Sequence, residues 1–193
     1  VMLLIILIGI FAFSYKTSEK EIKEDQKYVT ATPVANKVII LDAGHGVPDE
    51  GAQSSSGTTE AETNLKITLK VQHLLEQSGC TVILTRSDEN AIYSLDAKTL
   101  KEKKISDIRN RVKIGNTSSA DIFVSIHLNK IPQSQYSGWQ CFYQSKSEQS
   151  QKLAKSLQRS LNEAIQKENN RVAMKLDNVY IVKHVEIPLS IVE

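Results

Sequence analysis

Short runs of apolar residues, each bounded by polar or turn-forming positions, recur along most of this 193-residue chain. KVIILD at residues 37–42 is one such run, and DIFVSIH at residues 121–127 is another. Runs of this length and continuity are typical of strands that are buried on both faces of a sheet. We predict strands at residues 37–42, 81–85, 121–127, 138–143, 179–182 and 189–193.

Between these runs, apolar residues recur every three or four positions, which is the period of a helix with one buried face. Leu153, Leu157, Leu161 and Ile165 show this period most clearly. We predict helices at residues 60–79, 106–117 and 153–165, and a long charged loop at residues 86–106. Strands that alternate with helices indicate an α/β domain, with a mainly parallel mixed sheet of about six strands and helices on both faces.

The N-terminal part of the chain has a different pattern. Residues 1–13 are uninterruptedly apolar, whereas residues 14–36 are rich in charge and poor in large apolar side chains. The first segment suits a signal peptide or an N-terminal membrane anchor, and the second suits a polar linker. We therefore expect an exported protein, extracytoplasmic or membrane-anchored, whose folded domain occupies residues 37–193.

The composition excludes several classes of function. The chain is 40% apolar and 24% charged, as globular domains are, and a formal net charge of +2 is too small to favour a nucleic-acid partner. Cys80 and Cys141 lie in apolar stretches, which is typical of buried free thiols; a bridge formed after export is the alternative. Phosphate-binding glycine loops and the HExxH and GxSxG motifs are all absent from the sequence.

Residues with metal-binding or acid–base chemistry stand where predicted strands end. His45 lies between two glycines after the first strand, His127 closes the third, and Glu193 closes the last. The carboxyl ends of parallel strands meet at one edge of a sheet, so we expect these residues to lie close together. Two histidines and one carboxylate form a common catalytic zinc site. The carboxylate should come from the start of the first helix, where Glu60 and Glu62 both stand and only one can face the metal.

Glu193 follows the apolar run LSIV, where an ionised carboxylate is costly to bury without a partner or a task. Taking a proton from zinc-bound water is such a task, and an exposed charge at a strand end is the alternative. His73, on the first predicted helix, and His184, before the last strand, are expected to be surface or structural residues. Neither joins the predicted site.

Four segments carry a further signal: LDAGHG at residues 41–46, TEAETNL from Thr59, ADIFVSIHLN at residues 120–129 and IPLSIVE at residues 187–193. In this order and spacing they resemble the zinc-dependent N-acetylmuramoyl-L-alanine amidases of the Amidase_3 family. The segments LTR, IRNRVKIGN and NRVAMK add to the likeness, which extends from about residue 38 to residue 193. One such domain behind an apolar N-terminal segment resembles the CwlD type, which acts on spore cortex.

The resemblance implies that His45, Glu60 and His127 bind Zn²⁺ and that Glu193 is the catalytic carboxylate. It implies hydrolysis of the amide bond between N-acetylmuramic acid and L-alanine in peptidoglycan, outside the cytoplasmic membrane. It also implies the phosphorylase/hydrolase-like fold that zinc exopeptidases have. Membrane contact would run through residues 1–13, and an accessory protein partner is compatible with the resemblance.

Three positions depart from the family pattern: Ala43 stands where Pro is usual, Val47 where a further Gly is usual, and Ala61 where Lys is common. Family members also continue beyond the catalytic Glu, so we expect the domain at residues 37–193 to lack its C-terminal end. Two alternative functions stay open: a non-catalytic cell-wall-binding homologue, and a zinc carboxypeptidase that acts on cell-wall peptides.

Overall fold

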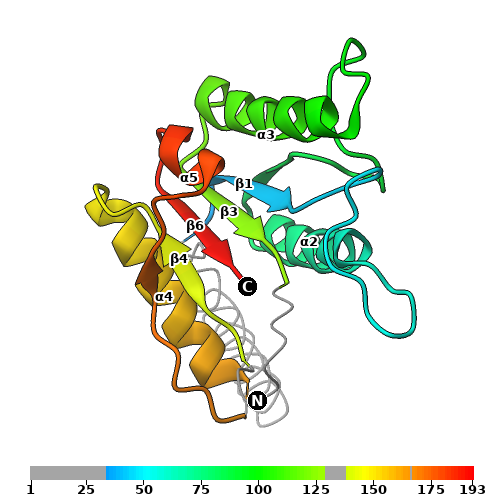
Figure 1. The fold of residues 1–193 in the computed structure, drawn as a ribbon. Helices are drawn as coiled ribbons and strands as arrows, with labels where there is room; N and C mark the ends of the chain where they lie inside the picture. Colours follow the sequence, from blue (N-terminus) through cyan, green and yellow to red (C-terminus); the bar gives the residue numbers. More distant parts are fainter. Residues whose placement is uncertain (1–33, 129–137, 166) are drawn as a thin grey trace, which may run out of the picture. The chain divides into compact units, whose positions relative to one another are not determined.

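Six strands form one sheet in the computed structural model, which describes residues 34–128, 138–165 and 167–193 (Figure 1). Their order across the sheet is β2-β1-β3-β6-β4-β5. The strands are β1 (Val38–Ala43), β2 (Thr81–Leu84), β3 (Ile122–Ile126), β4 (Cys141–Tyr143), β5 (Met174–Lys175) and β6 (Leu189–Val192). The apolar segment at residues 1–13, and residues 14–33 of the predicted linker, lie outside the described residues.

Most of the sheet is parallel, as predicted. β1 runs parallel to β2 and β3, and β3 runs parallel to β6. β4 is antiparallel to β6, and β5 is parallel to β4, so the sheet is mixed at one side. Because β1, β3 and β6 are adjacent and parallel, their carboxyl ends lie side by side at one edge. His45, His127 and Glu193 all follow these three strands.

Helices cover both faces of the sheet (Figure 1). Those of the described residues are α2 (Glu60–Gln77), α3 (Leu100–Thr117), α4 (Glu148–Ala164) and α5 (Tyr180–His184). α2 packs on β1, β2 and β3, and α4 packs on β4 and β6, whereas α3 and α5 contact each other on the opposite face. Of these helices, none combines a bilayer-spanning length with sufficient hydrophobicity.

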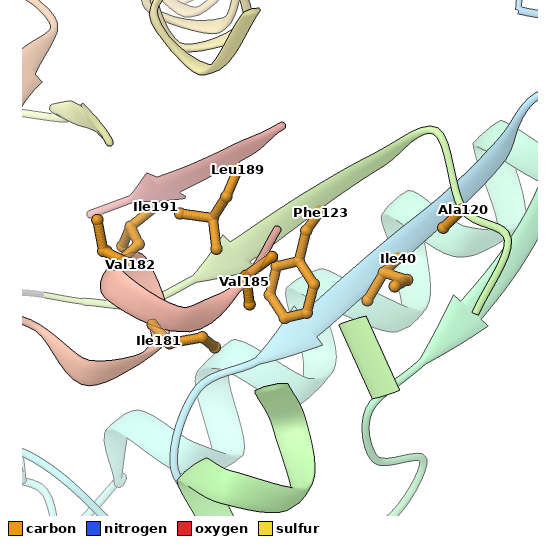
Figure 2. Close-up of a cluster of buried hydrophobic side chains, with 8 residues drawn as sticks. All are labelled: Ile40, Ala120, Phe123, Ile181, Val182, Val185, Leu189 and Ile191. Carbon is orange, nitrogen blue, oxygen red and sulfur yellow. The ribbon is translucent and has the colours of Figure 1, made fainter. Parts of the chain in front are cut away.

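The main core lies on the face of the central strands that α3 and α5 cover (Figure 2). Phe123 of β3 is completely buried there, with Ile40 of β1 on one side and Val185 on the other. The buried cluster consists of Ile40, Ala120, Phe123, Ile181, Val182, Val185, Leu189 and Ile191. Because strand side chains alternate, the neighbouring positions of the same strands face α2 and α4. The predicted α/β architecture with both faces covered is therefore confirmed.

The strand predicted at residues 179–182 is wrong, because this segment leads into the short helix α5. Ile181 and Val185 are four residues apart, and both are buried in the main core at 4% and 2% exposure. A four-residue apolar run cannot by its pattern distinguish a strand from one buried helical turn. The strand that actually precedes β6 is β5, which has only two residues and was not predicted.

The long loop predicted at residues 86–106 is also wrong in its last third, because α3 begins at Leu100. The Thr99 hydroxyl accepts a hydrogen bond from the backbone N–H of Glu102, and the Glu102 carboxylate accepts one from the backbone N–H of Thr99. This reciprocal pair is a capping box, which starts a helix without any apolar period. α4 likewise begins before its apolar period, at Glu148, behind the Ser147 cap.

Candidate metal centre

Three side chains converge at the edge of the sheet where β1 and β3 end. His45 lies just beyond β1, His127 directly follows β3, and Glu60 is the first residue of α2. Oε1 of Glu60 lies 3.1 Å from Nδ1 of His127 and 3.3 Å from Nε2 of His45. One nitrogen or oxygen of each residue lies within 4.8 Å of those of the other two. The structure therefore brings the three predicted metal ligands together.

The structure also distinguishes the two glutamates that open α2. The Glu60 side chain is 6% exposed and points to the histidines, whereas Glu62 is exposed and pairs with Lys66 at 2.6 Å. Two residues apart on a helix, the side chains point in nearly opposite directions. The resemblance implied Glu60, and the packing agrees because Glu60 faces the ends of β1 and β3.

The carboxylate of Glu60 is held by polar groups on every side. Besides the two imidazoles, it accepts hydrogen bonds from the backbone N–H groups of Ala52 and Leu128, both at 3.0 Å. Burial alone would raise the pKa of Glu60, but these hydrogen bonds hold it well below its usual range. Burial likewise would lower the pKa of His45, but the hydrogen bond and charge of Glu60 raise it. The site therefore keeps an ionised carboxylate beside two imidazoles.

This donor set fits a metal ion. Two imidazole nitrogens and one carboxylate oxygen are the protein ligands of many catalytic zinc sites, which leave a fourth coordination position open for water or substrate. A buried, ionised carboxylate is stabilised by a positive charge nearby, and a metal ion held by these three residues would supply it. The residues present are those that zinc would need.

The glycines that flank His45 have separate structural reasons. A Cβ atom at Gly44 would lie 2.3 Å from Nε2 of His127, so a side chain there would collide with the imidazole. Gly46 has a φ of +151°, and a Cβ there would lie 2.6 Å from the backbone nitrogen of Ala91. His45 itself has a φ of 63°, which residues with side chains rarely adopt. The loop is therefore both tightly packed and locally strained around the imidazole.

Replacing Gly44 by Ala is expected to weaken metal binding on the order of tenfold or more, because the new methyl group displaces the His127 ring from its orientation. Competition with a chromophoric chelator measures the affinity. Gly57→Ala is the matched control, since nothing lies within 4 Å of its new Cβ, although its φ of +87° adds backbone strain. Equal metal affinity of Gly44→Ala and the native chain would contradict the role assigned to Gly44.

Two buried arginines hold the backbone of this loop. Arg111 of α3 donates to the carbonyl oxygens of Ala43 and His45, both at 2.7 Å. Arg86, which follows β2, donates to the carbonyl oxygens of Ala43 at 2.8 Å and Gly44 at 3.0 Å. Three consecutive carbonyl groups are thereby fixed. Neither arginine is among the residues predicted from the sequence; LTR and IRNRVKIGN carry the signal for them, as parts of the family likeness.

Asp42 supplies the negative charge that balances Arg111. It is 1% exposed, and its Oδ1 lies 2.6 Å from Nη1 of Arg111. The hydroxyl groups of Thr85 and Ser125 donate to its two oxygens at 2.7 and 2.6 Å. Burial alone would raise the pKa of Asp42, but the Arg111 charge and the two hydroxyl groups lower it. Asp107 forms a second ion pair with Arg111, with a distance of 2.8 Å between Oδ2 and Nε. The buried guanidinium group of Arg111 is therefore paired with two carboxylates.

Glu193 lies with both histidines on the lining of one cleft, which has a volume of about 450 Å³. Its backbone is held by Gln140 on the neighbouring chain segment, with N···O distances of 3.0 and 2.7 Å. The apolar lining of the cleft consists of Ile105, Ile108, Leu176, Val179, Ile181 and Ile191. The predicted catalytic carboxylate and the two predicted histidine ligands therefore open onto the same space.

The remaining histidines and the cysteines lie apart from this centre. His73 contacts Gln77 at 3.0 Å on the exposed side of α2, and His184 stacks on Tyr180 with ring centroids 3.9 Å apart. Cys80 and Cys141 are buried thiols that form no disulfide bond. Burial raises the pKa of the Cys141 thiol to about 12, so the thiol stays protonated and is a poor nucleophile. The prediction of buried thiols is therefore confirmed, and the alternative of a disulfide bridge is not what the structure has.

Residues 39–193 match the family Amidase_3, N-acetylmuramoyl-L-alanine amidase. The chain is 33% identical over 187 residues to the germination-specific N-acetylmuramoyl-L-alanine amidase of Bacillus subtilis (strain 168), covering 97% of this chain and 76% of that protein.

Solved structures show the same relationship. The CwlD amidase of Clostridioides difficile, solved in complex with the GerS lipoprotein, has 43% sequence identity and a TM-score of 0.78, covering 82% of this chain and 81% of the other. The catalytic domain of CwlV, an N-acetylmuramoyl-L-alanine amidase from Bacillus (Paenibacillus) polymyxa var. colistinus, has 29% identity and a TM-score of 0.66, covering 81% and 79%. This chain therefore belongs to the N-acetylmuramoyl-L-alanine amidase family, Amidase_3.

Proposed function

We propose that this amidase holds zinc through His45, Glu60 and His127 and uses Glu193 as its catalytic carboxylate. The observation that carries the proposal is the convergence of the two imidazoles and the buried Glu60 carboxylate at the edge of the cleft that Glu193 also lines. The activity of the family is hydrolysis of the amide bond between N-acetylmuramic acid and L-alanine in peptidoglycan. Zinc, when bound, would supply a Lewis acid for the scissile carbonyl and for a water molecule.

In this proposal, different residues of the chain bind the metal, position the loop and transfer the proton. His45, Glu60 and His127 would bind the metal, and the two arginines would keep the backbone around His45 in place. Glu193 would accept the proton of the attacking water and deliver it to the nitrogen of the leaving L-alanine. Water thereby adds as hydroxyl to the lactyl carbonyl carbon and as hydrogen to the amine, and the C–N bond breaks. The apolar walls of the cleft would limit access of further water.

The substrate is peptidoglycan, and spore cortex is the form of it that we propose for this protein. The likeness to the germination-specific amidase of Bacillus subtilis, over 97% of this chain, supports that assignment. Peptidoglycan lies outside the cytoplasmic membrane, which agrees with export or anchoring by the apolar residues 1–13. The structurally similar CwlD amidase of Clostridioides difficile was solved in complex with the GerS lipoprotein, and this supports an accessory protein partner for the present chain too.

The test combines metal analysis with product analysis on purified peptidoglycan. We expect one zinc ion per chain and release of whole stem peptides that carry a new N-terminal L-alanine, identified by amine labelling and mass spectrometry. Removal of the metal by a chelator should stop peptide release, and added zinc should restore it. Loss of one terminal amino acid at a time would instead identify a carboxypeptidase. Binding to peptidoglycan without any release would identify a non-catalytic wall-binding protein.

A further inference from the structure

The chain folds back sharply directly after His45. Gly46 and Asp49 exchange two backbone hydrogen bonds, with N···O distances of 2.9 and 2.7 Å. Between them, Val47 donates its N–H to the carbonyl oxygen of Glu89 and accepts from the N–H of Ala91. Both ends of the turn are thereby held by backbone contacts. The turn places the side chain of Asp49 beside the ring of His45, on the side away from Glu60.

Asp49 uses its two carboxylate oxygens on two different partners. Oδ2 lies 3.5 Å from Nδ1 of His45, at the outer limit of hydrogen bonding, and Oδ1 lies 2.8 Å from Nζ of Lys104. Lys104 belongs to α3, so the contact joins this helix to the loop that carries His45. All three side chains line the same cleft as His127 and Glu193. A carboxylate held by a cation on one side is thus aimed at one nitrogen of His45.

The two imidazoles present different nitrogens to Glu60. His45 presents Nε2, at 3.3 Å, and His127 presents Nδ1, at 3.1 Å. A neutral imidazole carries one hydrogen and one lone pair. Both nitrogens of His45 face a carboxylate, Nδ1 that of Asp49 and Nε2 that of Glu60. A metal ion bound by Nε2 needs the lone pair on that nitrogen, so the hydrogen must then lie on Nδ1, where Asp49 is its acceptor. That lone pair is the one directed at the proposed metal position.

We propose that Asp49 is a positioning residue for the metal centre, which holds His45 in the tautomer that leaves Nε2 free for zinc, and that Lys104 holds Asp49 in place. The inference rests on the proposed zinc binding by His45, Glu60 and His127. Carboxylates in this outer position orient ligand histidines and raise their basicity in many zinc sites, and their loss typically weakens metal binding about 10- to 100-fold.

The experiment measures zinc affinity of the full chain by competition with a chromophoric chelator at neutral pH. Asp49→Ala is expected to bind zinc about 10- to 100-fold more weakly than the native chain, and Asp49→Asn, which keeps an acceptor oxygen without charge, should lie between. Lys104→Met should weaken binding by a smaller factor, about two- to fivefold, since exposed ion pairs are weak. The absorption spectrum of the Co²⁺-substituted protein should shift in Asp49→Ala, because the ligand geometry changes.

Two matched controls exclude general effects of charge. Glu50→Ala removes a carboxylate from the adjacent exposed residue, and Lys101→Met removes an exposed ammonium group from the same helix end; both should retain native zinc affinity within about twofold. Thermal unfolding of the metal-free proteins tests whether Asp49→Ala merely destabilises the loop. Zinc affinity of Asp49→Ala within twofold of the native value overturns the inference, and so does an equal loss in Glu50→Ala.

The outcome is separable from that of the proposed function. If the native chain does not bind zinc, the proposed metal centre fails and this inference fails with it. If the native chain binds zinc and Asp49→Ala binds it equally well, the metal centre stands and only the role of Asp49 is refuted.

Discussion

Replacing Glu193 by Gln is expected to lower the rate of stem-peptide release by about two to four orders of magnitude, the usual contribution of a positioned general acid–base group. Gln has the same shape but cannot accept the proton of the attacking water. Zinc content should stay at the native value, because Glu193 lines the cleft beside the metal ligands but is not one of the proposed ligands. The thermal unfolding midpoint should also stay native, because the backbone hydrogen bonds of Glu193 to Gln140 are unchanged. Release of peptides is measured as new amino termini per unit time.

Glu186→Gln is the matched control for this variant. Glu186 is exposed, belongs to the same C-terminal segment and bonds to Asn116 through its backbone N–H, which the substitution leaves intact. We expect native activity in Glu186→Gln. If Glu193→Gln retains more than a tenth of the native rate, Glu193 is an ordinary charge at a strand end and another group must carry the proton.

Removing either partner of the buried Asp42–Arg111 pair is expected to lower the free energy of unfolding by about 3 to 5 kcal/mol, since the remaining charge is left in the interior. Arg111→Met should lie at the upper end, because it leaves Asp42 without its cation and removes the Arg111 hydrogen bond to the carbonyl oxygen of His45. The carbonyl oxygen of Ala43 keeps its hydrogen bond from Arg86. Asp42→Asn should lie at the lower end, because Asp107 still pairs with Arg111. Urea denaturation of the metal-free proteins measures both effects.

Arg109→Met controls for loss of an arginine from α3, because Arg109 is exposed on that helix. It should change the unfolding free energy by at most about 0.5 kcal/mol. Unfolding free energies of Arg111→Met near those of Arg109→Met would show that the ion pair has no net stabilising effect.

The contribution of Asp42 to the free energy of unfolding of the native chain should also depend on pH. The folded pKa of Asp42 lies below the ordinary value of 3.8, so the contribution is complete above pH 3.8 and declines as pH falls further.

Much of the fold and of the site follows from local patterns. Mostly apolar runs identify β1, β3 and β6, because nearly every position of these strands is buried. An apolar run also identifies β2, although this edge strand is only partly buried. Their parallel arrangement then brings His45, His127 and Glu193 to one edge, whatever the details of the intervening loops. The order and spacing of four short motifs are by themselves enough to indicate the family.

Other features depend on contacts between distant parts of the chain. The sequence of residues 179–182 predicts a strand because a short apolar run carries no helical period. In the folded chain this segment leads into α5, and Ile181 and Val182 join Phe123 in the main core. The start of α3 is different, because it depends on a local contact: its first turn has no apolar period and is stabilised by the Thr99–Glu102 capping box.

The site, too, has features that local sequence predicts and features that only tertiary contacts determine. Residue types and strand ends are enough to predict two imidazoles and a carboxylate around a metal, because local sequence determines where each strand stops. Which glutamate faces inward, why Gly44 has no side chain, and how Arg86, Arg111 and Asp49 hold the loop depend on atoms brought together from β1, β2, α2 and α3. Asp49 contacts His45 four positions away, but its contact with Lys104 and the contacts of both arginines with the loop join residues tens of positions apart. No local pattern records those distant contacts, and folding alone establishes them.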